Sequence, residues 1–350
     1  MEEVALPIIL PVSEGDLASP GALGDVPGSE HCANKTVSDI SLQPVLLNHL
    51  PHEGGRVIVV GDTHGCFDEF KELLAQLDVN PEKDTVIIIG DIVNKGPESA
   101  NLLRYIIANR GHILALRGNH EDGALAVIES KRGGITNKLT SDPGWDWVDG
   151  LTGGEIQWLR DLPLTMVLQR LDVILVHAGL IPFPPFPLGG DPTAELVKQE
   201  HVVQTKLRIF VDDPKGTGQP GWVPYESNWK VRPDRKAKTP GQPWPKFVSW
   251  FELWKHNSHV IFGHDARKML QLGRWATGID TGCYQDDKNS RLTAMVLGVD
   301  GRGRPYIPSP EFLQERRETG CRPDEGIMDL PNDRPGVLFS IPKIRPKSTP

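Results

Sequence analysis

The sequence predicts an α/β protein in which two β-sheets pack face to face and helices cover their outer faces. Short apolar runs rich in valine and isoleucine, typical of buried strands, alternate with segments whose apolar residues recur at helical spacing. Farther along the chain, two strand-like runs follow each other without a helix between them, which indicates a second and more antiparallel sheet. With 350 residues, 38% of them apolar and 24% charged, the chain is long enough to bury one substantial core.

Strand and helix patterns alternate through the first half of the predicted core. A strand that ends in a glycine turn and is followed by an amphipathic helix forms a βαβ unit, and successive units build a mostly parallel sheet. The predicted strands are Val57–Val60, Thr85–Ile89 and Ile113–Leu116, and the predicted helices are 67–77, 99–109 and 123–130.

The second half of the core carries one helix, a pair of strands and then a longer mixed region. Thr152 is a suitable N-cap for a helix over Thr152–Asp161, because Glu155 completes a capping box. The remaining predicted strands are Met166–Gln169, Asp172–Val176, His259–Phe262 and Leu292–Val299, and the remaining predicted helices are Ala194–Phe210 and Phe247–Lys255.

Composition divides the chain into three parts. Residues 1–54 are rich in glycine, proline and serine and are predicted to be a flexible leader, within which Ser38–Leu50 forms a short helix or an edge strand. Residues 55–300 form the core domain, with a Pro/Gly/Trp-rich insertion or lid over 181–246. Residues 301–350, with many prolines and charges, are predicted to be a tail.

Charge and hydropathy exclude several classes of protein. A net charge of −8 argues against a general nucleic-acid binder, and no apolar run is long enough to span a membrane. The N-terminal region lacks the basic start and cleavage site of a signal peptide. The four cysteines have no CxxC spacing, so reduced thiols are expected. These features favour a cytoplasmic protein and do not indicate its oligomeric state.

Five of the predicted strands lead to a polar side chain beside a glycine. In open α/β sheets this edge is where ligands bind, and chance is a poor explanation for the same pattern at five strand ends. A surface turn that happens to hold an aspartate and a histidine would explain the first strand end equally well, if it stood alone. The side chains are Asp62 and His64, then Asp91, Asn119 with His120, His177 and His264.

These residue types suit a site for two divalent metal ions. Two such ions about 3.5–4 Å apart are the usual means of attacking a phosphate ester with water, and they require one bridging carboxylate with separate ligands on either side. Mixed oxygen and nitrogen ligands suit Mn, Fe, Zn or Co and do not choose among them. Asp62 and His64 would hold the first ion, Asp91 would bridge, and Asn119, His177 and His264 would hold the second.

The motifs GDTHG, GDIVNKGP, LRGNHED, HAG and GHD, followed by TGIDTGC and LTA, resemble the motif series of calcineurin-like metallophosphoesterases. Within that family the chain is similar to the branch of phosphoprotein phosphatases and symmetrical dinucleoside tetraphosphatases, and most to the ApaH-like phosphatases, through the Asn-Lys of GDIVNKGP and through FGHDAR with TGIDTGC. The resemblance covers residues 56–297 and is weak over 181–246. It implies a double-sheet sandwich, a dinuclear site with the same six ligands, and a catalytic domain that hydrolyses phosphoesters or phosphoanhydrides.

The resemblance also implies roles for residues beside the ligands. His120 would be the general acid that protonates the leaving oxygen, and Arg117, Lys95 and Arg208 would bind the non-bridging oxygens of the phosphate. A structural ion pair explains Arg117 equally well, and a solvated helix end explains Arg208 slightly better.

The chain departs from the protein phosphatases at Asn94-Lys95, where they carry Asp-Arg. An aspartate would hold the acid histidine protonated, whereas Asn94 orients His120 without stabilising its charge. A weaker acid suits a leaving group that is already good, such as a phosphate of inorganic polyphosphate or of a nucleoside or dinucleoside polyphosphate. The expected partner is therefore a phosphate-containing polyanion. The simpler alternative is that Asn94 and Lys95 arose by neutral sequence drift and that the substrates are the same as those of the protein phosphatases.

Two other functions stay open at this point. One is a Ser/Thr phosphoprotein phosphatase, and the other is a non-catalytic metal-binding scaffold, against which the intact ligand positions argue. A basic cluster inside the insertion fits a polyanionic substrate, although charges that keep a loop solvated are the commoner case. The cluster comprises Lys230, Arg232, Arg235, Lys236 and Lys238.

Overall fold

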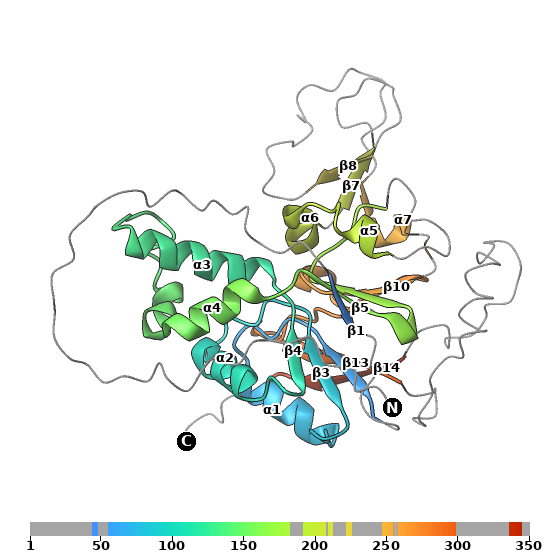
Figure 1. Ribbon diagram of the computed structural model, residues 1–350, viewed down its shortest axis with the longest axis horizontal. Helices are drawn as coiled ribbons and strands as arrows, with labels where there is room; N and C mark the ends of the chain where they lie inside the picture. Colours follow the sequence, from blue (N-terminus) through green and yellow to red (C-terminus); the bar gives the residue numbers. More distant parts are fainter. Residues whose placement is uncertain are drawn as a thin grey trace, which may run out of the picture. The chain divides into compact units, whose positions relative to one another are not determined.

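Two sheets packed face to face form the centre of the computed structural model (Figure 1). The structure describes residues 44–47, 55–182, 192–207, 209–212, 222–225, 247–254, 256, 258–298 and 336–344, all within a unit that spans Ile40–Pro350. Every structural statement below concerns these residues. The arrangement confirms the predicted α/β class with two sheets.

The first sheet has five strands and the second has six. The order in the five-stranded sheet is β14 (Gly336–Pro342), β13 (Arg291–Leu297), β2 (Val57–Val60), β3 (Thr85–Ile88) and β4 (Ile113–Ala115). The order in the six-stranded sheet is β1 (Val45–Leu47), β5 (Thr165–Leu168), β6 (Val173–Val176), β10 (His259–Phe262), β12 (Ala276–Gly278) and β11 (Gln271–Leu272). Strands β2, β3 and β4 pair in parallel, as expected for βαβ units, and β5 pairs with β6 antiparallel.

The side chains of β2 show why its sequence is apolar at every position. Val57 and Val59 belong to the core between the two sheets, together with Met166 of β5. Ile58 and Val60 belong to a second core on the outer face of the same sheet, beneath the helices. A strand that is buried on both faces cannot alternate apolar with polar residues, so it appears as a continuous run of valine and isoleucine.

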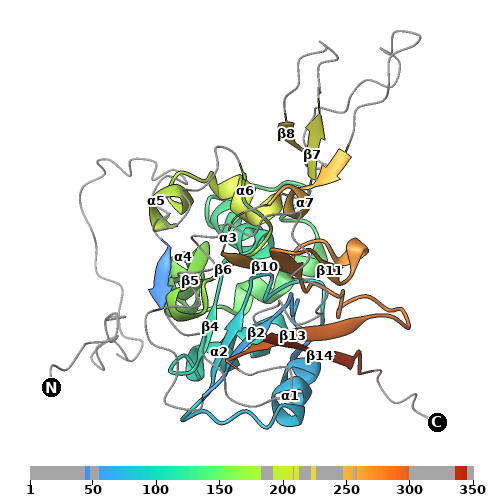
Figure 2. The same cartoon turned by 90° about the vertical axis from the view of Figure 1, so that its right-hand side faces the viewer.

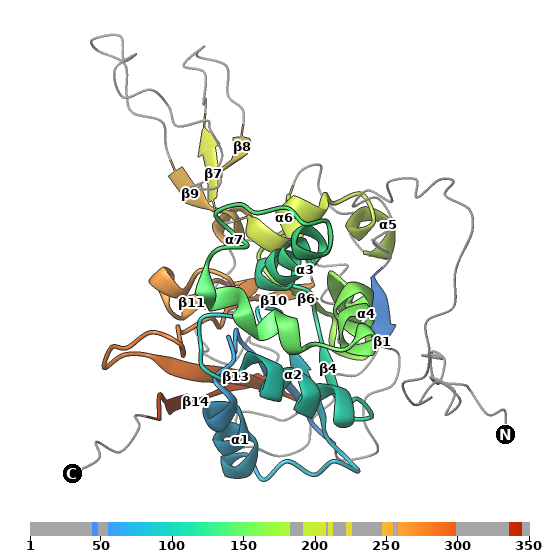
Figure 3. The ribbon, with the colours of Figure 1, turned by 90° about the vertical axis from the view of Figure 1, so that its left-hand side faces the viewer.

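Helices cover both outer faces of the sandwich. Figures 2 and 3 show α5, α6 and α7 on the opposite side of the two sheets from α1 and α2. The helices are α1 (Phe67–Gln76), α2 (Ser99–Ala108), α3 (Asn119–Arg132), α4 (Gly153–Asp161), α5 (Thr193–Leu196), α6 (His201–Lys206) and α7 (Trp250–Leu253), with 3-10 turns at Pro143–Gly150, Gln169–Leu171 and Ala266–Lys268. The predicted capping box of α4 is present, with Thr152 Oγ1 accepting from Glu155 N and Glu155 Oε2 accepting from Thr152 N. No helix in the described ranges is long and apolar enough to cross a bilayer.

Two predicted helices were wrong in part. The segment Ala194–Phe210 forms the short helices α5 and α6 and then enters strand β7 (Ile209–Asp212). The segment Phe247–Lys255 begins as strand β9 (Phe247–Ser249) before α7. Both differences have one cause: β7 pairs antiparallel with β9 and with β8 (Trp222–Tyr225) in a third, small sheet, and this pairing between segments distant in sequence overrides the local helical spacing.

The predicted leader and tail each contribute a strand. Val45–Leu47 pairs with β5, which confirms the edge-strand alternative for Ser38–Leu50. Gly336–Pro342 lies inside the segment predicted to be a tail, yet it pairs antiparallel along the whole of β13, from Arg291 opposite Pro342 to Leu297 opposite Gly336. The prediction missed β14 because its apolar run follows a long stretch dominated by prolines and charges. The remainder of the leader, of the tail and of the insertion lies outside the described residues.

The burial of β14 predicts that its inward side chain stabilises the sandwich. Ile341 is 1% exposed and pairs opposite Leu292 in β13, whereas its neighbour Ser340 is exposed. We expect Ile341→Ala to lower the free energy of unfolding by about 2–4 kcal/mol, because it removes buried methylene groups and leaves a cavity. Urea denaturation followed by circular dichroism measures this, with Ser340→Ala as the control that should change stability by less than about 0.5 kcal/mol. Equal effects of the two substitutions would show that β14 is not part of the core.

Candidate metal centre

The ends of strands from both sheets meet at one edge of the sandwich. Backbone hydrogen bonds join the loops that follow these strands, from His64 N to Asp91 O at 2.8 Å and from Gly263 N to His177 O at 2.8 Å. His177 Nδ1 also lies 2.9 Å from Ile89 O and so links the two sheets. As a result the structure brings together all six predicted metal ligands, Asp62, His64, Asp91, Asn119, His177 and His264.

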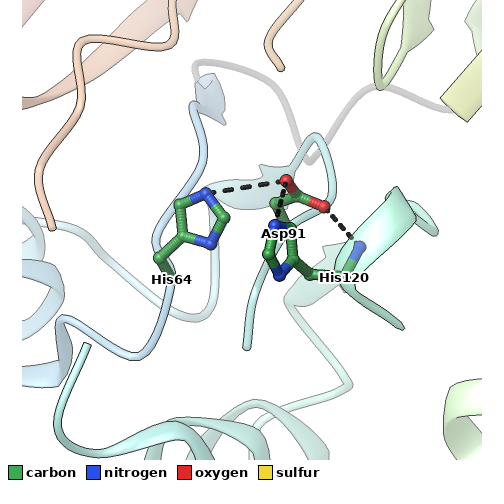
Figure 4. Close-up of side chains that lie close together, drawn as sticks. All are labelled: His64, Asp91 and His120. Carbon is green, nitrogen blue, oxygen red and sulfur yellow. Dashed lines mark hydrogen bonds and ion pairs between the residues drawn. The ribbon is translucent and has the colours of Figure 1, made fainter. Parts of the chain in front are cut away.

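Asp91 lies at the centre of this group. Its Oδ2 is 3.5 Å from His64 Nε2, and its Oδ1 is 3.3 Å from His177 Nε2 and accepts a hydrogen bond from His120 N at 2.9 Å. His64 and His120 both face the carboxylate (Figure 4). Burial opposes ionisation of Asp91, but the surrounding imidazoles hold its pKa well below the ordinary value. Asp91 is therefore a buried carboxylate that stays charged.

Two sets of potential ligand atoms share Asp91. In each set, the nitrogen and carboxylate atoms lie within 4.8 Å of one another; the first set is His64, Asp91 and His120, and the second is Asp91, His177 and His264. The first set differs from the prediction in containing His120. The predicted ligand Asp62 lies next to it, with Oδ2 4.0 Å from His64 Nε2. Asn119 joins the second set, with Oδ1 3.2 Å from His177 Nε2.

The chemistry of these atoms fits divalent cations. They combine carboxylate oxygens, imidazole nitrogens and one amide oxygen, a mixture that suits borderline transition metals. A positive charge is already present at this place, because Lys95 Nζ lies 3.0 Å from His64 Nε2 and stacks on the Tyr284 ring at 4.2 Å. A positively charged group therefore already lies beside one of the predicted ligand nitrogens.

The backbone fixes which imidazole nitrogen faces the centre. His64 Nδ1 lies 3.3 Å from Val93 O, and His177 Nδ1 lies 2.9 Å from Ile89 O. A carbonyl oxygen can only accept, so each Nδ1 carries a proton, and in the neutral form of the ring each Nε2 has a lone pair that faces the centre. Burial lowers the pKa of both histidines, against the opposing effect of the Asp91 charge. Neutral imidazole is the form that binds metals.

Several site residues have strained backbone. His64, Asp91 and His264 adopt positive φ angles of 46°, 48° and 72°, although none of them is glycine. Such conformations cost on the order of 1–3 kcal/mol each and persist only where the surroundings enforce them. Beside Asp91, Gly90 has a φ of 98°, and a Cβ there would lie 2.7 Å from His177 Nδ1. Strain and close approach thus concentrate where the ligands converge.

Glu121 holds the loop that carries Asp91. Its carboxylate is fully buried and accepts four backbone hydrogen bonds: Oε1 from Ile92 N and Val93 N at 2.8 and 3.2 Å, and Oε2 from Asp91 N and Gly118 N at 2.9 and 2.7 Å. Burial and the charge of Asp91 raise the pKa of Glu121 to about 8, against the opposing effect of these donors. One side chain therefore fixes the loops after both β3 and β4.

Asn94 fixes the tautomer of His120. Asn94 Oδ1 accepts from Lys95 N at 2.8 Å, which identifies the other end of the amide as the donor to His120 Nδ1 at 3.1 Å. With Nδ1 accepting, the proton of neutral His120 sits on Nε2, on the side of Asp91. Burial lowers the pKa of His120, with Lys95 acting in the same direction. The ring also stacks on Trp145 at 6.1 Å between centroids.

The structure gives a different result for each residue that was predicted to bind phosphate. Lys95 lies at the centre, as described above. Arg117 is buried, with Nε donating to Asp122 Oδ1 at 2.6 Å and a terminal nitrogen donating to Arg160 O at 3.3 Å, which favours the ion-pair alternative for this residue. Arg208 and the basic cluster 230–238 lie outside the described residues.

Sequence reasoning assigned no role to two buried acids of this site. Glu121 stands within the quoted motif LRGNHED and Asp280 within TGIDTGC, so position in a motif was the available signal. Burial, and after it the charges of Asp280 and Asp91, raise the pKa of Asp62 well above its ordinary value. Burial and the charge of Asp91 also raise the pKa of Asp280 to about 6. The centre thus contains two more buried carboxyl groups than the six predicted ligands supply.

The four hydrogen bonds of Glu121 predict a large effect of a neutral substitute. Glu121→Gln places an NH2 group against two backbone N–H donors in either orientation of the amide. We expect the free energy of unfolding in the presence of a chelator to fall by about 2–4 kcal/mol, because two buried donors lose their acceptor. The matched control is Glu129→Gln on the same helix, where the side chain is 62% exposed and pairs with Arg160. A loss from Glu121→Gln no larger than that of the control would contradict this role.

Comparisons with known proteins agree with these observations. A family model described as calcineurin-like phosphoesterase matches residues 55–278. Bacterial proteins named symmetrical bis(5'-nucleosyl)-tetraphosphatase are similar to this chain. The protein of Serratia proteamaculans is 31% identical over 64% of this chain and 86% of its own length, and that of Yersinia enterocolitica is 31% identical over 75% and 94%. The protein of Chromobacterium violaceum is 37% identical over 67% and 91%.

A solved structure described as a "putative diadenosine tetraphosphatase" has the same fold. It aligns over 87% of this chain and 99% of its own length, with 23% sequence identity and a TM-score of 0.55. The family match covers most of the sandwich and contains five of the strand ends that meet around Asp91. The chain therefore belongs to the calcineurin-like phosphoesterase family, whose members use divalent metal ions, and is a hydrolase of phosphoric ester or anhydride bonds.

Proposed function

We propose that the centre holds two divalent cations and hydrolyses phosphoanhydrides. Asp62 and His64 hold the first cation, Asp91 bridges, and Asn119, His177 and His264 hold the second. The observation that carries the proposal is the sharing of Asp91 between two sets of ligand atoms from the two sheets. When bound, the cations supply Lewis acidity toward the phosphoryl oxygens and a nucleophilic water at neutral pH. Mn, Zn, Fe and Co all suit this set of ligands.

The residues around the cations have the tasks of binding phosphate and moving a proton. Lys95 offers an ammonium group at the edge of the centre, and a shift of its flexible stem away from His64 lets it contact a non-bridging phosphate oxygen. His120 holds a proton at Nε2. In the imidazolium form it gives this proton to the leaving oxygen and returns to neutral imidazole, and in the neutral form it donates a hydrogen bond to a leaving oxygen that departs as an anion. Arg117 acts through Asp122, which it fixes at the start of α3, and Arg208 stays a proposed phosphate ligand.

The substrate class follows from Asn94 together with the similar proteins. Asn94 donates to His120 Nδ1, so a second proton on this nitrogen would face a donor, and the imidazolium form is disfavoured. A neutral imidazole can donate a hydrogen bond but does not readily release its proton, which suits a phosphate or nucleotide, a good leaving group that can depart without being protonated. The similar proteins are named tetraphosphatases. We therefore propose dinucleoside polyphosphates, nucleoside polyphosphates or inorganic polyphosphate as substrates. Hydrolysis of a phosphoserine protein is the alternative, and a location in the cytoplasm stays a prediction.

The bridging role of Asp91 predicts a severe loss on substitution. Asp91→Asn keeps an acceptor for His120 N but removes the charge shared by both cations. We expect hydrolysis of every substrate to fall by more than about a hundredfold, the scale for removing one electrostatic contact to a transition state. Metal content by mass spectrometry should fall as well, while circular dichroism stays unchanged. Asp68→Asn, at a side chain 62% exposed on α1, is the control. Turnover by Asp91→Asn comparable with the unaltered protein would rule out the two-cation centre.

The contact between Asn94 and His120 predicts a shift in substrate preference. Asn94→Asp places a carboxylate beside Nδ1, which raises the pKa of His120 and extends its protonated form to higher pH. We expect turnover of a phosphoserine peptide, relative to diadenosine tetraphosphate and polyphosphate, to rise by about tenfold or more, because a serine leaving group needs the proton most. The assay compares the three substrates side by side with added Mn²⁺.

The control for this assay is Asn137→Asp, an exposed residue whose Oδ1 accepts backbone hydrogen bonds from Leu139 and Thr140. If the unaltered protein already prefers the phosphopeptide, the protein-phosphatase alternative holds. Absence of turnover for all three substrates would instead favour the scaffold alternative.

A further inference from the structure

Helix α6 is joined to the loop that follows β6 and carries His177. Gln204 O accepts from Ala178 N at 2.8 Å, at the residue directly after His177. Just before α6, the Gln199 side chain accepts from Ile181 N at 2.8 Å and donates to Ile181 O at 3.3 Å. These hydrogen bonds fix the helix next to this loop of the six-stranded sheet.

The same helix contacts the start of α3. His201, the first residue of α6, has its Nε2 2.8 Å from Asp122 Oδ2, and the two side chains are only 18% and 22% exposed. The other oxygen of the Asp122 carboxylate accepts from Arg117 Nε at 2.6 Å. A carboxylate in such an ion pair accepts hydrogen bonds, so His201 donates from Nε2, and a neutral imidazole is sufficient for that. Asp122 thus joins α6 to Arg117, and these two residues flank Asn119 in the chain.

The two neighbours of α6 carry predicted ligands of the same cation. Asn119 begins α3 after β4 of the five-stranded sheet, and His177 follows β6 of the six-stranded sheet. Because β4 and β6 belong to different sheets, strand pairing does not set the distance between these ligands, yet Asn119 Oδ1 lies 3.2 Å from His177 Nε2. Helix α6 contacts the chain close to both, at Ala178 and at Asp122. It therefore links the two ligand-bearing loops from the side of the insertion.

We propose that His201 is a positioning residue for the second cation. Through Asp122 it holds the start of α3, and with it Asn119, at the distance from His177 that a shared cation requires. The segment 181–246, predicted to be an insertion or lid, thus takes part through α6 in building the metal centre. The inference rests on the proposed function, because it requires that Asn119 and His177 bind one cation.

His201→Ala and His201→Gln test this inference as a pair. Alanine removes the hydrogen bond to Asp122, whereas the amide nitrogen of glutamine can donate in place of the imidazole Nε2. We expect His201→Ala to lower the affinity for one of two Mn²⁺ ions by about tenfold, the low end of the effect of residues that support metal ligands. Calorimetry on the metal-free protein measures this affinity. His201→Gln should restore most of the loss, and equal losses from the two variants would contradict the role of the hydrogen bond.

The melting temperature in a chelator separates positioning from simple stabilisation. A His201 that only stabilises the fold would lower the melting temperature when replaced by alanine and leave the Mn²⁺ affinity unchanged, and that result would overturn the proposal. The matched control is Glu200→Ala, at an exposed residue whose side chain makes no capping hydrogen bond to α6, and it should change neither quantity. If His201→Ala fails to fold, His201→Met is the second variant; it fills the space without a donor and carries the same expectation.

The failure of the inference is distinguishable from failure of the proposed function. If the unaltered protein binds fewer than two Mn²⁺ ions per chain, the two-cation proposal fails, and the role of His201 fails with it. If the unaltered protein binds two ions and His201→Ala binds both with unchanged affinity, the inference about His201 alone fails.

Discussion

The buried charge of Asp91 is the constraint on which the rest of the site depends. A carboxylate with no access to water is stable only if positive charge or hydrogen-bond donors surround it. Here the backbone N–H of His120 donates to Asp91, and the imidazoles of His64 and His177 lie beside the carboxylate from different strand ends and interact favourably with it when they carry a proton at Nε2. Each of these groups is placed by a different element, so the charge of one residue couples the ends of both sheets. Divalent cations held in the way proposed above would add to this compensation.

The fold brings the predicted ligands together by enforcing unfavourable backbone conformations at several of them. Positive φ angles at His64, Asp91 and His264 would not persist in isolated loops. They are enforced by bonds between segments: Gly65 N donates to Ile92 O, and the buried carboxylate of Glu121 collects the N–H groups of the loop after β3. These groups would otherwise be buried without partners. The hydrogen bonds that position the ligands are therefore also the ones that offset the strain of presenting them.

The sequence predicted best those structural features that depend on residues close together in the chain. Strand β2 and helix α4 depend on a run of valines and on the pairing of Thr152 with Glu155, both of which are visible within a few residues. The convergence of Asp62 and Asp91 was predictable because the neighbouring parallel strands β2 and β3 present their ends at one edge of the sheet. Strands β7, β9 and β14 were missed because they depend on partners far along the chain. Arg117 and Asp122 are only five residues apart, yet the sequence left an ion pair and phosphate binding equally open for Arg117, because the choice depends on how the loop after β4 folds.

The hydrogen-bond pattern at His120 connects the electrostatics of the centre to its chemistry. The orientation of the Asn94 amide is set by Lys95 N, and it leaves His120 Nδ1 as an acceptor. A protonated imidazole would then need to be stabilised by Asp91 alone, whose charge is already shared among three imidazoles and would be shared further by bound cations. The histidine can still hold one proton at Nε2 but gains little from a second. A centre built in this way is suited to bonds whose leaving group departs as an anion, and anhydrides between phosphates are bonds of that kind.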